Sequence, residues 1–466
     1  MLSFFRINDP YRLIIIAIIL IAIRLVLFWG DAQVVSELHW MLIGESLNDG
    51  RNLYSDIWDN IPPFSATIYS LIDQIFGRSP HAYHIISIVL VLIQAFLFNA
   101  VLIKHKAFAE NTYLPAFIYV ILMNVFFDMA VLSPVLLSLI FIILAFDSII
   151  THLVTKKDDQ LIFFTGVYLG IATLFYYAAF TLLIATFASY LLLTGTSARR
   201  HLLLFFGFVM PIIITAIYFY LRGSAKEFYI DYILSIFTVE AFMALDFVSF
   251  ISIVLIPLLF IIIAVVKTFS AIGYNNQQQR VQKVMFFMLA LGIAAWFVNR
   301  ERSPYQLTIF ALPTAFFLTH FFLSIKKKWH AEVIFSVFLA VIIFANIATY
   351  KEYAFTKKII NFERLLVQKT DWDTITNEKK ILVIGDDISA YKNATLATPY
   401  FNWQLSQQHL ENQNYYDNIT AIFLNFKNNL PEVIIDKEAV MENLQSNIPL
   451  LKSKYKKHAD NVYVLR

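Results

Sequence analysis

The sequence predicts a polytopic α-helical membrane protein with a small C-terminal α/β domain. Three observations support this fold class. Hydrophobic residues make up 59% of the 466 residues and charged residues only 15%, whereas an ordinary globular chain carries about 25% charged residues. Long apolar stretches recur up to about residue 349, and the rest of the chain is polar with short apolar runs. The mean hydropathy of +0.65 therefore describes a chain with too little polar surface to fold in water.

The apolar stretches have the length of membrane-spanning helices. Such a helix needs about 20 mainly apolar residues, because lipid offers the backbone no hydrogen-bond partners. We expect about eleven spans in a transmembrane domain over residues 1–349. They are predicted near residues 13–30, 84–103, 113–127, 134–154, 161–177, 178–196, 202–221, 248–270, 285–298, 307–325 and 331–349. Pro211 and Pro257 fall inside two of these stretches and predict kinks.

Lysine and arginine are concentrated in alternate loops between these stretches. If the N-terminus is cytoplasmic, the cytoplasmic loops contain roughly 14 of these residues and the opposite loops roughly 6, and positive residues favour the cytoplasmic side. We therefore expect a multi-pass protein of the cytoplasmic (inner) membrane, with a cytoplasmic N-terminus and an outer C-terminal domain.

The polar C-terminal part predicts a separate domain. Residues 350–371 are expected to form a linker helix, and residues 372–466 an extracytoplasmic α/β domain. Three short apolar runs, at 381–386, 433–436 and 462–465, are separated by polar helical stretches and are typical of buried strands.

Composition also excludes several function classes. The chain has no cysteine, which excludes disulfide scaffolds, thiolate metal sites and cysteine nucleophiles. The net charge of +3 is too small to indicate nucleic acid as a partner, so membrane lipids are the partners that composition favours.

The first outer loop, residues 31–80, contains more chemistry than a simple turn needs. Its acidic residues far outnumber its basic ones between 31 and 62. The apolar spacing predicts an amphipathic helix over 32–47 on the membrane surface, with Glu45 reaching water at its end. Asp31 follows the first span, where an aspartate commonly caps a helix; a cap would also hold its carboxylate at the lipid–water boundary.

The sequence around this loop resembles the GT-C superfamily of membrane glycosyltransferases, relatives of the protein O-mannosyltransferases and of bacterial envelope glycosyltransferases. The resemblance begins with an acidic residue after the first span, Asp31. It continues in a Gly, Leu-Tyr, Asp, Trp-Asp and Pro-Pro run over residues 50–63 and in a Phe-Gly turn at 76–77. Two weaker similarities follow, at Asp128 and at residues 300–305, where basic residues precede Tyr305.

The resemblance implies an enzyme that moves a sugar from a polyprenyl-phosphate donor to an envelope acceptor on the outer face of the membrane. Such a reaction needs a general base for the acceptor hydroxyl, and Asp31 is the candidate. The departing lipid phosphate needs a cation, for which Arg300, Arg302 and Arg222 are candidates, unless they are interface anchors.

Further site residues follow from the same resemblance. Asp128 is expected to be catalytic, either by holding the acceptor or by sharing a divalent cation with Asp31, although it could equally cap a helix. Carboxylates alone would favour Mg²⁺ or Mn²⁺. Trp58, Asp59 and Tyr305 are expected to bind substrate.

Two other function classes stay open on the sequence alone. One is a transporter or flippase for a lipid-linked glycan, and the other is a non-catalytic GT-C-like scaffold of an envelope complex. Arg24 lies inside the first apolar stretch, where a charge is a functional suspect. It could snorkel to the surface, or pair with Asp31 or with a lipid phosphate.

Overall fold

The computed structural model describes residues 1–27, 33–155, 158–350, 361–370, 372–397, 399–413 and 415–466, without the side chains of 345–350. Its residues form two compact units. Unit 1 consists of residues 1–32, 81–214 and 242–362, and unit 2 of residues 33–80, 215–241 and 363–466. Asp31 and half of the predicted linker helix, residues 351–360 and 371, lie outside the described residues.

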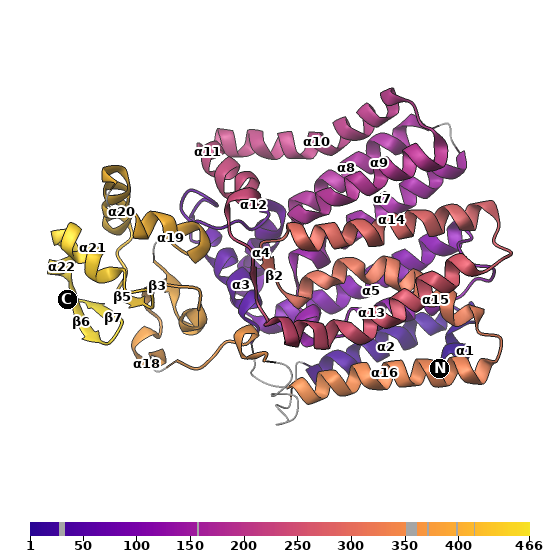
Figure 1. Cartoon of the computed structure of the whole chain (residues 1–466). Helices are drawn as coiled ribbons and strands as arrows, with labels where there is room; N and C mark the ends of the chain where they lie inside the picture. Colours follow the sequence, from indigo (N-terminus) through magenta and orange to yellow (C-terminus); the bar gives the residue numbers. More distant parts are fainter. Residues whose placement is uncertain (28–32, 156–157, 351–360, 371, 398, 414) are drawn as a thin grey trace. The chain divides into compact units, whose positions relative to one another are not determined.

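Unit 1 is built almost entirely of helices, and Figure 1 shows the long ones with their axes roughly aligned. Its helices are α1 (Leu2–Phe5), α2 (Tyr11–Leu27), α5 (Pro80–Lys104), α6 (Leu114–Leu122), η1 (Phe127–Ala130), α7 (Pro134–Thr155), α8 (Asp159–Phe175), η2 (Tyr177–Phe180), α9 (Thr181–Thr194), α10 (Ala198–Leu221) up to Ile214, α13 (Phe247–Ser270), α14 (Asn276–Val298), η4 (Pro304–Phe310), α15 (Ala311–Ser324) and α16 (Lys328–Tyr350). Helix α15 is buried along most of its length and packs against α13, α14 and α6.

Seven helical segments in the described residues are long and apolar enough to cross a membrane. Each of the eleven predicted stretches contains a helix, which confirms a polytopic helical protein. The stretch at 113–127 differs from the expectation, because α6 has only 9 residues, or about 14 Å, and the chain continues through η1. Pro211 and Pro257 lie inside α10 and α13, as predicted.

Helices α8 and α10 approach each other at backbone distance. Gly166 and Gly170 on α8 face α10, and Gly207 on α10 faces α8. A Cβ atom at any of the three would collide with a backbone carbonyl oxygen of the opposite helix. Small residues allow such close contact between membrane helices, so these glycines set the spacing of the pair.

Unit 2 contains a five-stranded sheet in the order β4-β3-β5-β7-β6. Strands β4 (Thr395–Leu396), β3 (Lys380–Ile384) and β5 (Val433–Asp436) are parallel. Strand β7 (Val462–Leu465) is antiparallel to β5 and to β6 (Tyr455–Ala459). The three predicted strands are confirmed.

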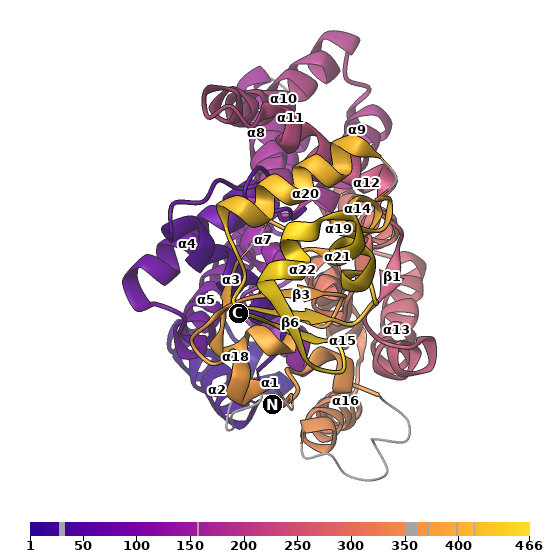
Figure 2. The same ribbon diagram turned by 90° about the vertical axis from the view of Figure 1, so that its left-hand side faces the viewer.

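Short helices complete the C-terminal part of unit 2. They are η5 (Glu363–Leu365), α18 (Asp373–Thr376), η6 (Ser389–Asn393), α19 (Trp403–Glu411), α20 (Tyr416–Asn428), α21 (Met441–Asn447) and α22 (Pro449–Lys454). Figures 1 and 2 show α19, α20 and α21 on one side of the sheet and α18 on the other. The core between them includes Leu382, Ile434 and Phe426.

Two segments distant in sequence join this α/β part in unit 2. The first contains α3 (Val35–Asn48) and α4 (Pro63–Phe76), and the second contains α11 (Ala225–Glu227), the π-helix η3 (Phe228–Leu234) and α12 (Ser235–Thr238). The helix predicted over 32–47 is present as α3, but the expectation that Glu45 reaches water is wrong. Glu45 is half-buried and pairs with Arg78 at 2.5 Å, and burial raises its pKa despite that cation.

Candidate functional site

Asp128 lies in the single turn η1, and its side chain is fully buried. Its Oδ2 accepts a hydrogen bond of 2.8 Å from the backbone N–H of Tyr305. Tyr305 is in the first turn of η4, where N–H groups have no partner inside the helix. A carboxylate that accepts from such a group acts as a cap. The structure therefore brings together two of the sequence-predicted site residues, which are 177 positions apart.

Arg24 holds η1 from the opposite end. Its guanidinium donates to the carbonyl oxygen of Ala130 and to the amide oxygen of Asn124. It also donates to Ser87 Oγ at 3.0 Å, and Ser87 donates to the same Ala130 carbonyl at 2.8 Å. Arg24 therefore does not snorkel to the surface. Its buried guanidinium binds the loop that contains Asp128.

The predicted arginines lie on a strand-like segment beside η4. Strand β2 (Glu301–Arg302) pairs in parallel with β1 (Phe242–Met243), and the N–H of Phe242 donates to the Arg300 carbonyl at 2.8 Å. The N–H of Arg300 donates to the Tyr177 hydroxyl at 3.0 Å.

The Arg302 side chain stacks on aromatic rings. Its guanidinium carbon is 5.3 Å from the ring centre of Trp296 and 5.5 Å from that of Phe297. Cation–π contact of this kind orients an arginine, and Arg302 Nη2 also donates to the Phe297 carbonyl at 3.4 Å. Arg222, in unit 2, is similarly placed over Tyr218 at 5.7 Å.

Trp58 and Asp59 are bound to the C-terminal part of unit 2. The N–H of Trp58 donates to the Pro399 carbonyl at 2.8 Å, and its own carbonyl accepts from the N–H of Asn402 at 3.1 Å. The Asp59 carboxylate is buried and pairs with His39 Nε2 at 2.8 Å. These contacts hold the first outer loop against the α/β part of the unit, whereas Asp128, Arg300, Arg302 and Tyr305 belong to unit 1.

Asp231 is a candidate that the sequence analysis missed. It lies in η3, and burial together with the nearby carboxylates of Asp59 and Glu227 raises its pKa to about 7. The same segment packs on the first outer loop, because the Tyr54 ring lies 5.8 Å from that of Phe228. A carboxyl group that titrates near neutral pH is suited to proton transfer. The signal in the sequence is one carboxylate in an otherwise apolar, aromatic run.

The predicted metal site does not assemble around Asp128 in the part of the chain that the structure describes. No three His, Asp or Glu side chains are grouped there as metal ligands. Mg²⁺ requires near-octahedral oxygen coordination, and Asp128 already uses one oxygen for a backbone N–H. The described residues alone do not form a cation site, and the predicted site that includes Asp31 stays a prediction.

A family model matches more than half of the chain. The match covers residues 60–353, and the family is described as a family of unknown function (DUF6427). The chain belongs to this family. A comparison with curated proteins gives no match.

Solved structures of similar fold cover nearly the whole chain. The crystal structure of ArnT from Cupriavidus metallidurans bound to undecaprenyl phosphate has a TM-score of 0.56 at 12% identity, over 98% of this chain and 98% of that chain. The apo state of the same protein gives 0.56 at 12% identity, over 97% of both chains. The apo Archaeoglobus fulgidus oligosaccharyltransferase gives 0.50 at 10% identity, over 96% of this chain and 73% of that chain. This member of the family therefore has the GT-C fold, which confirms the resemblance at the level of fold.

Proposed function

We propose that this protein is a membrane glycosyltransferase that moves a sugar from a polyprenyl-phosphate donor to an envelope acceptor, on the outer face of the cytoplasmic membrane. The observation that carries the proposal is the Asp128–Tyr305 hydrogen bond. It joins two segments that each resemble a GT-C motif, in a chain with the GT-C fold. The undecaprenyl phosphate in the ArnT structure supports a lipid-phosphate donor for this chain too.

In the proposed reaction, the acceptor hydroxyl oxygen forms a bond to the anomeric carbon of the sugar. The bond between that carbon and the phosphate oxygen breaks, and polyprenyl phosphate leaves with the electron pair. Asp31 takes the hydroxyl proton as general base. Arg300 and Arg302 stabilise the charge on the departing phosphate, with Arg302 oriented by its aromatic contacts.

We assign Asp128 a positioning role in this scheme. Its side chain is fully buried and one of its oxygens accepts from the Tyr305 N–H. It is therefore suited to holding the start of η4, which follows Arg300 and Arg302 in the chain. Arg24 supports the same turn from the Ala130 carbonyl. Trp58 and Asp59 hold the first outer loop in place, with substrate contact by either as an additional proposal.

The direct test uses Asp31→Asn in purified full-length protein with labelled polyprenyl-phosphate sugars, and measures labelled product and released polyprenyl phosphate. Loss of a general base is expected to slow transfer roughly 100-fold or more. Asp49→Asn is a matched control, because Asp49 is an exposed carboxylate of the same loop and its removal should leave the rate unchanged.

Two outcomes would count against the proposal. Transfer by Asp31→Asn at the wild-type rate would show that the base is misassigned. Wild-type protein that transfers no sugar from any polyprenyl-phosphate donor, but moves the lipid-linked glycan across a proteoliposome membrane, would favour the transporter instead.

A further inference from the structure

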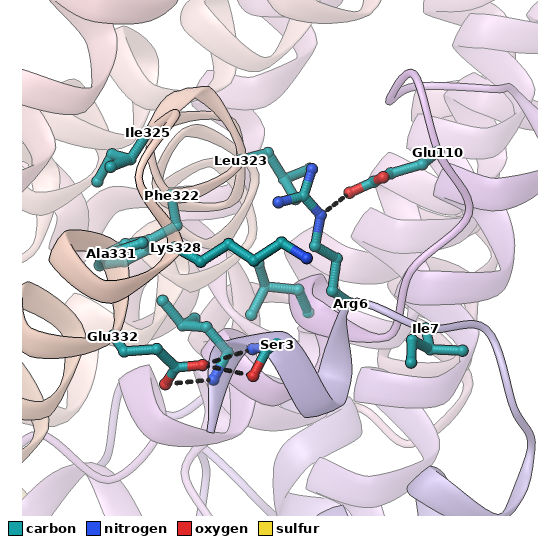
Figure 3. A pocket seen from close by; sticks show the side chains of 12 residues that line it. Ser3, Arg6, Ile7, Glu110, Phe322, Leu323, Ile325, Lys328, Ala331 and Glu332 are labelled. Carbon is teal, nitrogen blue, oxygen red and sulfur yellow. Dashed lines mark hydrogen bonds and ion pairs between the residues drawn. The ribbon is translucent and has the colours of Figure 1, made fainter.

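A cavity of about 370 Å³ opens in unit 1, and Asp128, Arg300 and Arg302 are not among the residues that line it. Three segments line it: the start of the chain, the loop that precedes α6, and the connection between α15 and α16 (Figure 3). Its charged residues are Arg6, Glu110, Lys328 and Glu332. Equal numbers of positive and negative side chains would suggest a neutral cavity, but their hydrogen bonds differ.

Both carboxylates already have donors within the protein. Glu332 accepts from the backbone N–H groups of Leu2 at 3.0 Å and of Ser3 at 2.7 Å, and from Ser3 Oγ at 2.7 Å. Glu110 accepts from Arg6 Nε. Both carboxylates are therefore held by donors of the protein itself.

The two cations keep donors for a ligand. Arg6 uses only its Nε for Glu110, which leaves the two terminal amino groups of the guanidinium. Lys328 makes no side-chain hydrogen bond or ion pair with the described residues, and Figure 3 shows it extending across the cavity toward Arg6. Two like charges that approach each other repel unless an anion lies between them.

The rest of the lining is apolar. Leu114, Phe322, Leu323 and Ile325 contribute hydrocarbon surface, and the last two lie at the end of a helix long and apolar enough to span a membrane. The cavity therefore combines a hydrocarbon wall with two cations at the end of a membrane helix. This combination suits an amphiphile with an anionic head.

We propose that this cavity binds a phosphate group between Arg6 and Lys328. Arginine and lysine are the usual phosphate partners. The source of the phosphate is either an anionic lipid headgroup, which would also use the apolar wall, or free phosphate. The inference does not depend on glycosyl transfer, since none of these residues belongs to the proposed reaction.

The test measures thermal unfolding of the full-length protein in a neutral detergent, titrated with short-chain phosphatidylglycerol, short-chain phosphatidylcholine or inorganic phosphate. We expect saturable stabilisation by phosphatidylglycerol and not by phosphatidylcholine. Lys328→Ala should weaken the apparent affinity at least tenfold, because it removes a cation that makes no ion pair with the described residues. Saturation at much lower concentration by the lipid than by inorganic phosphate identifies a lipid site, and equal affinity identifies free phosphate.

Lys326→Ala is the matched control. It removes the same charge two residues away from Lys328, and Lys326 does not line the cavity. It should leave the affinity unchanged. Equal weakening by both variants would overturn the proposal by showing a diffuse charge effect, as would stabilisation that Lys328→Ala leaves intact. An Arg6→Gln variant tests the second cation, and its ion pair with Glu110 is exposed enough for the fold to survive its loss.

Discussion

Two carboxylates in two regions of the molecule show how surroundings decide what an aspartate does. Asp128 in unit 1 is fully buried and accepts a hydrogen bond from a helix N-terminus. Asp231 in unit 2 is less buried, and two other carboxylates lie near it. The more buried group is held in a structural contact, whereas the less buried one has the pKa near neutral. What surrounds a carboxylate, a helix N-terminus or other carboxylates, therefore indicates its role as much as the residue type does.

Removing the Asp128 side chain should have the largest effect on stability. Asp128→Ala leaves the buried N–H of Tyr305 without this acceptor, which costs about 2–3 kcal/mol. Asp128→Asn keeps an acceptor oxygen and should cost less. Thermal unfolding in detergent measures both. If the two variants were as stable as wild type, Asp128 would not be a structural cap, and the contrast with Asp231 would fail.

Removing the Asp231 carboxylate should have the opposite effect and raise the stability of the folded protein at high pH. Its pKa is about 7 in the folded protein and about 3.9 when unfolded, so its favourable contribution is complete below about pH 4 and is lost as the pH rises through 7. At pH 8, Asp231→Asn should therefore be more stable than wild type, by on the order of 1 kcal/mol after solvent screening.

The Asp231 measurement is the difference in unfolding midpoint between variant and wild type from pH 4 to pH 8. Every other ionisable group is present in both proteins, so its contribution largely cancels. A difference that stays constant over this range would contradict the raised pKa.

Asp246 offers an exposed carboxylate for comparison with both. It caps α13 by accepting from the N–H of Ser249 at 3.0 Å and from its hydroxyl at 2.7 Å, and these hydrogen bonds lower the pKa of Asp246. Asp246→Ala should cost about 1 kcal/mol above pH 4, and the cost should vanish as the pH falls below the lowered pKa. Unfolding midpoints at pH 7 and pH 3 measure it, and an equal loss at both would rule out the cap.

Local patterns in the sequence predict the architecture well. Apolar length locates the helices, and short β-branched runs such as Val433–Asp436 locate the strands. The same patterns mislead at 113–127, where composition does not reveal that α6 ends after Leu122 and that the chain turns into η1.

The site is predicted less completely, because its contacts are made at long range. Asp128 and Tyr305 were selected separately by resemblance, but a hydrogen bond to a backbone N–H leaves no side-chain pattern from which to pair them. No sequence motif marks Asp231. Its pKa is raised mainly by burial and by Asp59, which is far away in sequence, and neither cause leaves a local pattern. Trp58 and Asp59 matched a motif, yet their partners at Pro399, Asn402 and His39 could not be predicted from it.

The glycine contact between α8 and α10 limits how a long-chain lipid could reach the interior of unit 1. Where Gly166, Gly170 and Gly207 meet the facing backbone, the two helices leave no room for even one methyl group. An isoprenoid chain, which is wider than a methyl group, cannot pass there. This helix pair forms a closed wall along that contact, and any lateral entrance for a lipid carrier must lie between other helices.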